Sequence, residues 1–412
     1  MKEKTQQNLV KFISFLSRRK SLFTLLGGYE WWLKKKWPSP DLAQTSYLLT
    51  IHSIRELYQR KKPVVWTSLF FPSEFIWAGS MVPFYPEIAS GLVAALRWSD
   101  FPLRSSFQKW VSADLCSYHR LSLGMSLLKL FPRPDFLIAT NTICQGTVGF
   151  FQTLAQLWRV PFYLIDVPFA DFSASEKYIS YQLESLAQNL SQEWGIRFRW
   201  EQVFSCSNQT RAVIKDIENL RKQKTIILAP PTKNLDYLPY YYQFMGTRAS
   251  LSFFTQLLAQ LSLTEPSSCH RLLWLHLKPF YPNPVPEWLE KNNLGVAFEE
   301  FASLYPGELS SREPFSSLAR KILYSWQLTV GRKRISHVLQ LVQEFEVQGV
   351  VQFNQWGCRQ SQGMNFPLRQ ALRKQEIPFL ELDGDQIDQN HRSDEQWKTR
   401  IQALAEMLEG NR

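Results

Sequence analysis

Three of the five cysteines lie at positions where their thiols could bind a ligand or take part in a reaction. Cys358 comes five residues after the apolar run that ends at Phe353, and Cys144 comes four residues after the run at 136–140. Such runs of β-branched and aromatic residues predict buried strands. Ligands of open α/β sheets collect beyond the carboxyl ends of strands. Cys116 lies 28 residues before Cys144, on a helical or turn segment. The central question is whether these three side chains meet in one cleft.

Three thiolates that meet would bind a soft metal. Sulfur ligands select iron–sulfur clusters, zinc or copper(I). A four-iron cluster usually takes four cysteines, so three would leave one iron open to water or to a substrate oxygen. The sequence has no C-x-x-C pair, which disfavours a zinc ribbon or a thioredoxin-type site. The alternative for each cysteine is a small buried hydrophobe. That alternative is our interpretation of Cys206 and Cys269, which lie in helix-like or loop-like contexts.

Predicted strands alternate with predicted helices in two parts of the chain, which favours βαβ units and parallel sheets. The strands of the first part are predicted over residues 64–71, 136–140 and 162–166, with helices over 107–123 and 146–158. Those of the second part are predicted over 271–276, 295–298, 350–353 and 378–382, with helices over 335–345 and 393–408. We therefore expect an α/β fold with two Rossmann-like parallel-sheet domains.

Changes in the pattern of predicted strands and helices along the sequence also suggest domain boundaries. We expect a helical N-terminal region at 1–62, a first α/β domain at 63–175, a helical connecting region at 176–265 and a second α/β domain at 266–412. The apolar residues at 9–16 predict an amphipathic helix packed on the body. The layout suggests an internal duplication, although no residue repeat supports one.

Composition narrows the classes of protein. The chain has 412 residues, more than one core usually serves, and 45% of them are hydrophobic. Its net charge of +11 suits an anionic ligand or an acidic partner. No nucleic-acid-binding signature accompanies that charge, so we expect no nucleic acid partner. An odd count of five cysteines argues against a disulfide framework and favours the reducing cytoplasm.

The absence of several sequence motifs argues against further classes of protein. No run of 18 apolar residues predicts a membrane span, and no cleavage site indicates a signal peptide. The sequence also lacks GxxxxGK[ST], GxGxxG and GxSxG. It therefore predicts neither an ATPase nor a dinucleotide enzyme nor a serine hydrolase.

Several stretches, taken in order, carry a family resemblance across about 350 residues. They are PSEFIWA at 72–78, DLCSYHR at 114–120, PDFLIATNTIC at 134–144, GCRQS at 357–361, IPFLELDGDQ at 377–386 and EQWKTR at 395–400. Together they resemble the 2-hydroxyacyl-CoA dehydratase and benzoyl-CoA reductase family of iron–sulfur subunits. CRQS and the acidic stretch 383–388 are nearer the benzoyl-CoA reductase branch, whereas QFNQW at 352–356 departs from the family pattern.

The resemblance implies a cofactor, partners and a reaction. Cys116, Cys144 and Cys358 would be ligands of a [4Fe–4S] cluster with one open iron. The partners would be a homologous iron–sulfur subunit and a separate ATP-hydrolysing activator that injects electrons at low potential. The substrate would be an acyl- or aryl-CoA thioester. In dehydratases the electron makes a ketyl radical at the thioester carbonyl, so that the 2-hydroxyl can leave. In reductases the electrons enter a conjugated aromatic ring. Both reactions require that water be kept from the radical.

Other functions stay open at this point. The chain could be a non-catalytic electron-transfer or scaffold subunit of such a complex. A double-cubane ATP-dependent reductase is a further alternative, although it should need more cysteines than the three at hand. The plainest alternative is an α/β binding protein without a cluster.

Several polar residues are further candidates. Glu74 matches the P-x-E position, where the resemblance implies a base; the alternative is a carboxylate in the first turn of a helix. Glu87 could also act as the base, or it could have only a structural role. Ser361 is a candidate to hydrogen-bond a cluster sulfur or the substrate, or to stabilise a turn. The positive charge of Arg120 would stabilise the negative charge of the thiolates and the cluster, or Arg120 would form a surface ion pair. The acidic group Asp383, Asp385 and Asp388 is interpreted as a solvated loop rather than a magnesium site.

Overall fold

The computed structural model describes residues 20–108, 111–142, 144–168, 172–223, 228–323 and 331–410. The amphipathic helix predicted around residues 9–16 lies outside the described residues. The described N-terminal part forms two helices that pack on each other, α2 (Lys20–Lys36) and α3 (Leu42–Gln59). Asp41 begins α3 with a reciprocal capping box to Gln44, which satisfies amides at the helix start.

The first sheet is wholly parallel in the described part of the chain. Its order is β2-β1-β3-β4. The strands are β1 (Val64–Thr67), β2 (Val82–Phe84), β3 (Phe136–Thr140) and β4 (Phe162–Ile165). The helices of this lobe are α4 (Ser73–Ala78), α5 (Pro86–Ala95), α6 (Asp100–Phe107), α7 (Ser117–Leu127) and α8 (Gln145–Trp158).

The second sheet repeats the arrangement. It is also parallel, in the order β6-β5-β7-β8, so each sheet has the order 2-1-3-4 when its strands are numbered within its own half. The strands are β5 (His270–Leu275), β6 (Leu294–Glu299), β7 (Gly349–Gln355) and β8 (Phe379–Gly384). The helices of this lobe are α12 (Val285–Lys291), α14 (Gly331–Glu344), α15 (Arg359–Gln362), α16 (Asn365–Arg373) and α17 (Asp394–Gly410). The prediction of two Rossmann-like parallel sheets is confirmed.

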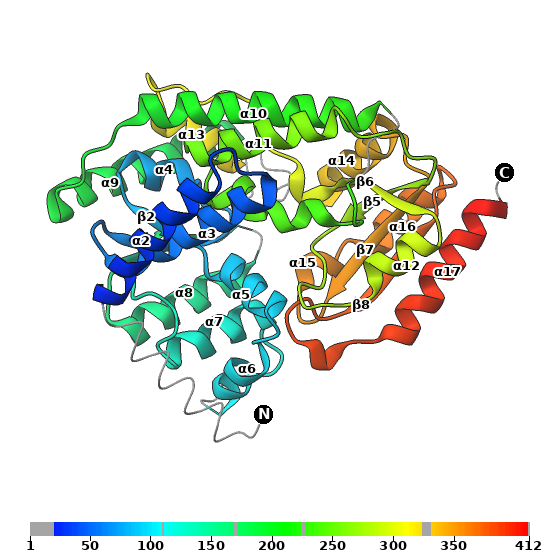
Figure 1. Cartoon of the computed structure of the whole chain (residues 1–412), viewed down its shortest axis with the longest axis horizontal. Coiled ribbons are helices and arrows are strands. Elements are labelled where there is room, and N and C mark those ends of the chain that lie inside the picture. Colours follow the sequence, from blue (N-terminus) through cyan, green and yellow to red (C-terminus); the bar gives the residue numbers. More distant parts are fainter. Residues whose placement is uncertain are drawn as a thin grey trace.

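Long helices join the two lobes (Figure 1). They are α9 (Phe172–Trp194), α10 (Trp200–Lys222), the short turns Lys233–Tyr237 and Pro239–Gln243, and α11 (Arg248–Leu261). α9 packs on the first sheet, α11 lies under the second, and α10 contacts α4 as well as β6. α13 (Pro314–Leu323) follows the short turn Glu300–Ala302 after β6, yet packs on α9 of the first lobe.

Alternating side chains of the strands fill separate cores. Val64 and Trp66 of β1 face the core that holds α5, α7 and α8, whereas Val65 faces α9. The inner strands β1, β3, β5 and β7 are buried along their whole length, as expected for parallel strands covered on both faces. Burying each large apolar side chain of this kind contributes about 1.5–3 kcal/mol.

Two local predictions were wrong. The helix predicted over 107–123 is in fact two helices, because α6 ends at Phe107 and α7 begins only at Ser117. The strand predicted over 64–71 ends at Thr67, since the chain turns there. The short strand β2 went unpredicted; it contains Pro83, which a strand tolerates at the edge of a sheet.

The strand order fixes where a ligand site is expected. In a 2-1-3-4 sheet the connections leave in opposite directions on either side of the first strand, which makes a crevice at the carboxyl ends of the first and third strands. These ends are those of β1 and β3 in the first lobe and of β5 and β7 in the second. Among the described residues, no helix combines the length and apolar character that crossing a bilayer requires.

Candidate active site at the carboxyl ends of the two sheets

Each of the three candidate cysteines directly precedes a helix. Cys116 comes before α7, Cys144 before α8 and Cys358 before α15. Cys144 follows β3 and Cys358 follows β7, so two of them stand at the crevices that the strand order predicts. The start of α7 and of α8 directs the positive end of a helix dipole towards the nearby sulfur, which favours a thiolate.

The three thiols lie near one another. A Cβ atom on Gly357 would lie 2.8 Å from the carbonyl oxygen of Asp114 and 3.9 Å from the amide nitrogen of Cys116, so the loop of Cys358 touches that of Cys116. Burial raises the pKa of the Cys116 thiol well above its usual value, and the nearby Cys358 and Cys144 raise it further. Burial likewise raises the pKa of Cys144, and Cys358 adds to the effect. A metal is what would make such thiols ionise.

The donor set suits a cluster better than a single ion. The described residues contain no group of three or more His, Cys, Asp or Glu side chains that could hold a metal ion as they stand. Around one Zn²⁺ the sulfurs crowd at about 2.3 Å from the same centre. In a four-iron cluster each thiolate binds a different iron, so the sulfurs stand farther apart. Three neighbouring cysteines are donors of the kind that iron–sulfur clusters use, and the cluster itself stays a prediction.

The surroundings of Cys144 include a buried histidine. A Cβ atom on Gly146 would lie 3.2 Å from the Cys144 sulfur and 3.9 Å from Nδ1 of His119. The His119 ring stacks on Phe150 with centroids 4.3 Å apart, and burial lowers its pKa to about 4. Its Nδ1 is buried without a hydrogen-bond partner among the described residues. An unpaired polar atom next to the sulfur is suited to a hydrogen bond with cluster sulfur.

A buried polar network joins the two lobes beside the cysteines. The Ser117 hydroxyl donates to Asp385 at 2.7 Å and accepts from the Gln355 amide at 3.0 Å. Arg120 is buried and lies 3.8 Å from Asp385 and 3.5 Å from Asp388. The prediction of a solvated loop is therefore wrong for Asp385 and Asp388, and that of a surface ion pair is wrong for Arg120, because the opposite lobe covers these side chains. The Asp383 side chain, in β8, is 44% exposed and pairs with Arg400.

Ser361 belongs to the loop that carries Cys358. Its hydroxyl donates to the Cys358 carbonyl oxygen at 3.0 Å, and its side chain is fully buried. The amide of Gln352 donates to the Ser361 carbonyl oxygen. Ser361 thus stabilises the turn that holds Cys358 in place.

Glu74 lies in the first turn of α4 and is completely enclosed. One of its oxygens accepts from Lys321 at 2.6 Å and from the Ser207 hydroxyl at 2.7 Å. The other oxygen has no hydrogen-bond partner among the described residues. Glu87, in the first turn of α5, is different: burial raises the pKa of its carboxyl to about 8, although backbone amides oppose the shift.

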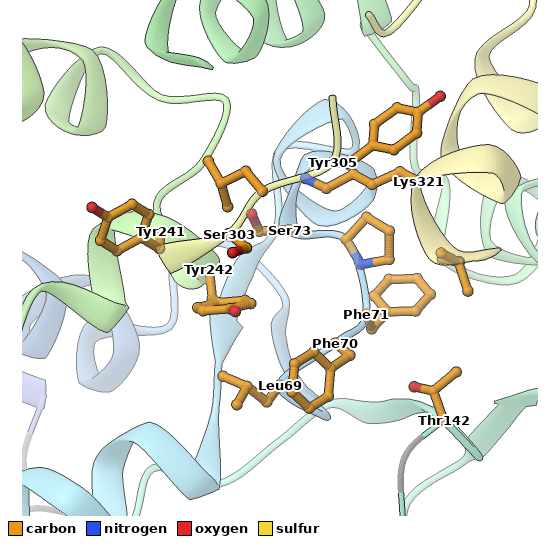
Figure 2. A pocket seen from close by; sticks show the side chains of 13 residues that line it. Leu69, Phe70, Phe71, Ser73, Thr142, Tyr241, Tyr242, Ser303, Tyr305 and Lys321 are labelled. Atoms are coloured by element: carbon orange, nitrogen blue, oxygen red, sulfur yellow. The ribbon is translucent and has the colours of Figure 1, made fainter. Parts of the chain in front are cut away.

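A pocket opens next to these residues (Figure 2). Its walls come from the segment after β1, from Thr142 just before Cys144, from the turn at 239–243, from the loop after β6 and from α13. The lining residues are Leu69, Phe70, Phe71, Pro72, Ser73, Thr142, Tyr241, Tyr242, Ser303, Leu304, Tyr305, Lys321 and Ile322. Sequence reasoning missed Lys321 and the tyrosines, because nothing in their local pattern differs from that of ordinary helix residues.

Comparison with known proteins shows which family this chain belongs to. A family model described as 2-hydroxyglutaryl-CoA dehydratase, D-component, matches residues 68–408. Lactoyl-CoA dehydratase subunit alpha of Anaerotignum propionicum is 24% identical, over 87% of this chain and 93% of the relative. The (R)-phenyllactyl-CoA dehydratase alpha subunit of Clostridium sporogenes is 23% identical, over 86% and 91%. The (R)-2-hydroxyisocaproyl-CoA dehydratase alpha subunit of Clostridioides difficile is also 23% identical, over 84% and 90%.

Proposed function

The chain belongs to the 2-hydroxyglutaryl-CoA dehydratase D-component family, and from this premise we propose that it is the [4Fe–4S]-carrying subunit of an enzyme that removes water from a 2-hydroxyacyl-CoA thioester. The observation that carries the proposal is the approach of Cys116, Cys144 and Cys358 at the facing ends of the two sheets. Three half-buried soft donors, with no fourth cysteine near them among the described residues, suit a cluster with one open iron.

Different residues of this chain would have different roles in the proposed reaction. Cys116, Cys144 and Cys358 would hold the cluster, and Ser361 would fix the turn of Cys358. When bound, the cluster would supply an open iron for the thioester carbonyl and an electron at low potential. The aromatic walls of the pocket beside Thr142 would help to keep water away from the reacting acyl group once it is bound.

Dehydration is the better supported reaction. The family description and the three relatives named above all refer to dehydratases of 2-hydroxyacyl-CoA thioesters. A benzoyl-CoA reductase-like reduction, which the stretches CRQS and 383–388 suggest, stays a prediction. Conversion of a 2-hydroxyacyl-CoA to the enoyl-CoA by the purified complex would support dehydration; ring reduction of an aryl-CoA without that conversion would contradict it.

Two partners belong to the proposal. A homologous iron–sulfur subunit would complete the active complex, and a separate ATP-hydrolysing activator would deliver the electron. This chain has no GxxxxGK[ST] sequence with which to bind ATP phosphates in a P-loop, so the activator would be a different protein.

Glu74 stays a candidate base, but its surroundings favour a different part. The carboxylate is enclosed and paired with Lys321, whereas Lys321 itself lines the pocket. Glu74 therefore acts on the pocket through Lys321, as a positioning residue. Loss of a general base usually lowers turnover by about 10²–10⁴-fold at unchanged specificity, whereas loss of a positioning partner changes which thioesters bind.

The decisive experiment is anaerobic purification with iron and sulfide analysis. Wild-type protein should carry about four irons per chain. Replacing Cys116, Cys144 or Cys358 by serine should remove the cluster, because each sulfur holds a separate iron. Cys206→Ser and Cys269→Ser are matched controls that should keep the iron. Wild-type protein without iron, or equal iron in all five variants, would overturn the proposal.

A further inference from the structure

We propose that the pocket in Figure 2 binds the side chain of the acyl group and selects uncharged apolar or aromatic side chains over side chains that end in a second carboxylate. This inference rests on the proposed function, because it takes an acyl-CoA thioester as the substrate. The pocket walls, the hydrogen bonds of its polar groups and the charge of its cation each support the selection.

The position of the pocket makes it the place for an acyl side chain. Thr142 lines it and precedes Cys144 by only two residues, and Leu69 to Ser73 line it just after the end of β1. A thioester whose carbonyl lies at the sulfur trio would therefore have its side chain within reach of this pocket. The loop after β6 and helix α13 close the pocket from the other side.

The lining is largely aromatic. Phe70 packs edge-on against Tyr242 with ring centroids 5.8 Å apart. The Tyr242 hydroxyl donates to the Phe301 carbonyl oxygen at 2.9 Å, and the Tyr241 hydroxyl donates to Asn234 at 3.1 Å. Since both hydroxyls bond to the protein, these tyrosines offer mainly their rings to a ligand. Rings and branched alkyl groups pack well against such a wall.

The small polar groups of the lining are also occupied by the protein. The Ser73 hydroxyl donates to the Met245 carbonyl oxygen at 3.1 Å. The Thr142 hydroxyl bonds to that of Thr140, and Ser303 shares a hydrogen bond with His337 at 3.3 Å. A ligand carboxylate can only accept hydrogen bonds, so it would have to take a hydroxyl proton away from one of these bonds or stay unpaired, and an unpaired buried polar group costs about 1–3 kcal/mol. A pocket of this kind disfavours polar side chains.

Lys321 is the cation that lines the described part of the pocket, and its charge is already paired. Glu74 lies behind the wall and accepts from the Lys321 ammonium at 2.6 Å. The Glu74 carboxylate is fully enclosed and the Lys321 side chain is 23% exposed, so solvent screens the pair less than it screens a surface ion pair. A second carboxylate on the ligand would meet a neutral pair instead of an unpaired cation. The ion pair thus neutralises the charge of Lys321, which among the described lining residues is the group that could receive a dicarboxylic acyl group.

The first test is binding of unreactive thioesters, which lack the 2-hydroxyl and so need no turnover. The complex purified from its host is titrated with 3-phenylpropionyl-CoA, 4-methylpentanoyl-CoA and glutaryl-CoA. We expect the two apolar thioesters to bind at least about tenfold more tightly than glutaryl-CoA, a difference of 1.4 kcal/mol. If glutaryl-CoA binds as tightly as the others, the selectivity inference is overturned while the proposed function stands. If none binds, the proposed function itself fails.

The second test changes the ion pair. Glu74→Gln keeps the shape but leaves Lys321 as an unpaired cation, so glutaryl-CoA should bind at least about tenfold more tightly than to wild type. The double variant Glu74→Gln with Lys321→Met is the matched control. It lacks both charges and should lose that gain. A Glu74→Gln variant that still rejects glutaryl-CoA, or a double variant that accepts it, would show that the pair does not set the selectivity. If Glu74→Gln does not fold, the ratio of wild-type affinities for the apolar thioesters and glutaryl-CoA, together with the double variant, still tests the inference.

Discussion

Glu74 and Glu87 both stand in the first turn of a helix, where the helix dipole favours a carboxylate, yet their partners differ. Glu74 has Lys321 within 2.6 Å. Glu87 has no comparable ion pair among the described residues, and one of its oxygens is buried without a partner. Burial therefore dominates at Glu87 and raises its pKa to about 8. Environment, and not helix position, separates the two carboxyls.

This shift predicts a pH dependence of stability. Glu87 has a folded-state pKa of about 8 against a reference value of 4.5, so the folded protein holds a proton that the unfolded chain has lost. Its contribution to stability is present below pH 4.5 and is lost as the pH rises through 8. Glu87→Gln should thus stabilise the protein at pH 8 by about 1–3 kcal/mol and change little at pH 4.5.

Thermal unfolding at several pH values measures this effect. Glu184→Gln, which alters an exposed carboxylate on α9, is the control and should leave the pH profile unchanged. A Glu87→Gln profile parallel to that of wild type would show that Glu87 ionises normally in the folded protein.

At the scale of the elements, Gly357 decides how closely the loops of Cys358 and Cys116 approach. Its φ is +74°, and a side chain there would lie 2.8 Å from the Asp114 carbonyl oxygen. Backbone cannot give way as a flexible side chain does, so Gly357→Ala should push Cys358 away from Cys116. We expect loss of most bound iron from a protein that still folds, with a cost of about 1–3 kcal/mol from the backbone conformation.

The matched control is Gly149→Ala in α8. That glycine has a helical environment with nothing within 4 Å of an added Cβ, so the change should leave iron content intact and stabilise the helix by about 0.5–1 kcal/mol. Iron analysis and circular dichroism after anaerobic purification compare the two variants. Full iron content in Gly357→Ala would contradict the close approach of the two loops.

The elements also show which parts of the fold and site the sequence could predict. β3 is an apolar run and β7 begins as one, both are buried along their whole length, and the cysteines that follow them could be placed by the strand-end rule. β2 has three residues and a proline, too little signal for any local rule. The break between α6 and α7 went unpredicted because the apolar spacing continues through it, and a local pattern does not record the contact of Asp114 with Gly357 of the other lobe.

Long-range contacts were beyond local patterns altogether. Lys321 meets Glu74 across 247 residues, because α13 leaves the second half of the chain and packs on α9 of the first lobe. The burial of Asp385 has the same cause, since its acidic stretch is covered only once Ser117 and Arg120 of the other lobe are in place. Such residues become recognisable only from the fold.

At the scale of the whole molecule, the two lobes share one apolar core and one buried set of hydrogen bonds. We call this set the polar seam; it joins Gln386 to Tyr118, Leu277 and Gln355. A single apolar cluster contains Trp66 and Leu137 of the first sheet together with Trp274 and Phe353 of the second. Beside it, Gln386 joins the lobes. Its side-chain oxygen accepts from Tyr118 at 3.0 Å, its side-chain amide donates to the Leu277 carbonyl oxygen at 2.9 Å, and its backbone amide donates to Gln355 at 2.6 Å. The cysteines lie on both sides of this seam, so their spacing depends on it.

Gln386→Met tests the seam, because methionine keeps the volume but neither donates nor accepts as the amide does. The Tyr118 hydroxyl and Nδ1 of His276 would lose their partner, and the Leu277 carbonyl would keep only the 3.4 Å bond from Trp274, which should cost about 2–4 kcal/mol in all. We expect the single calorimetric transition of a coupled molecule to broaden or split, and bound iron to be lost faster to a chelator. Gln375→Met, an exposed substitution on the same lobe, should do neither. If Gln386→Met unfolds and keeps its iron as wild type does, the shared apolar core alone holds the lobes, and the polar seam serves only to satisfy buried groups.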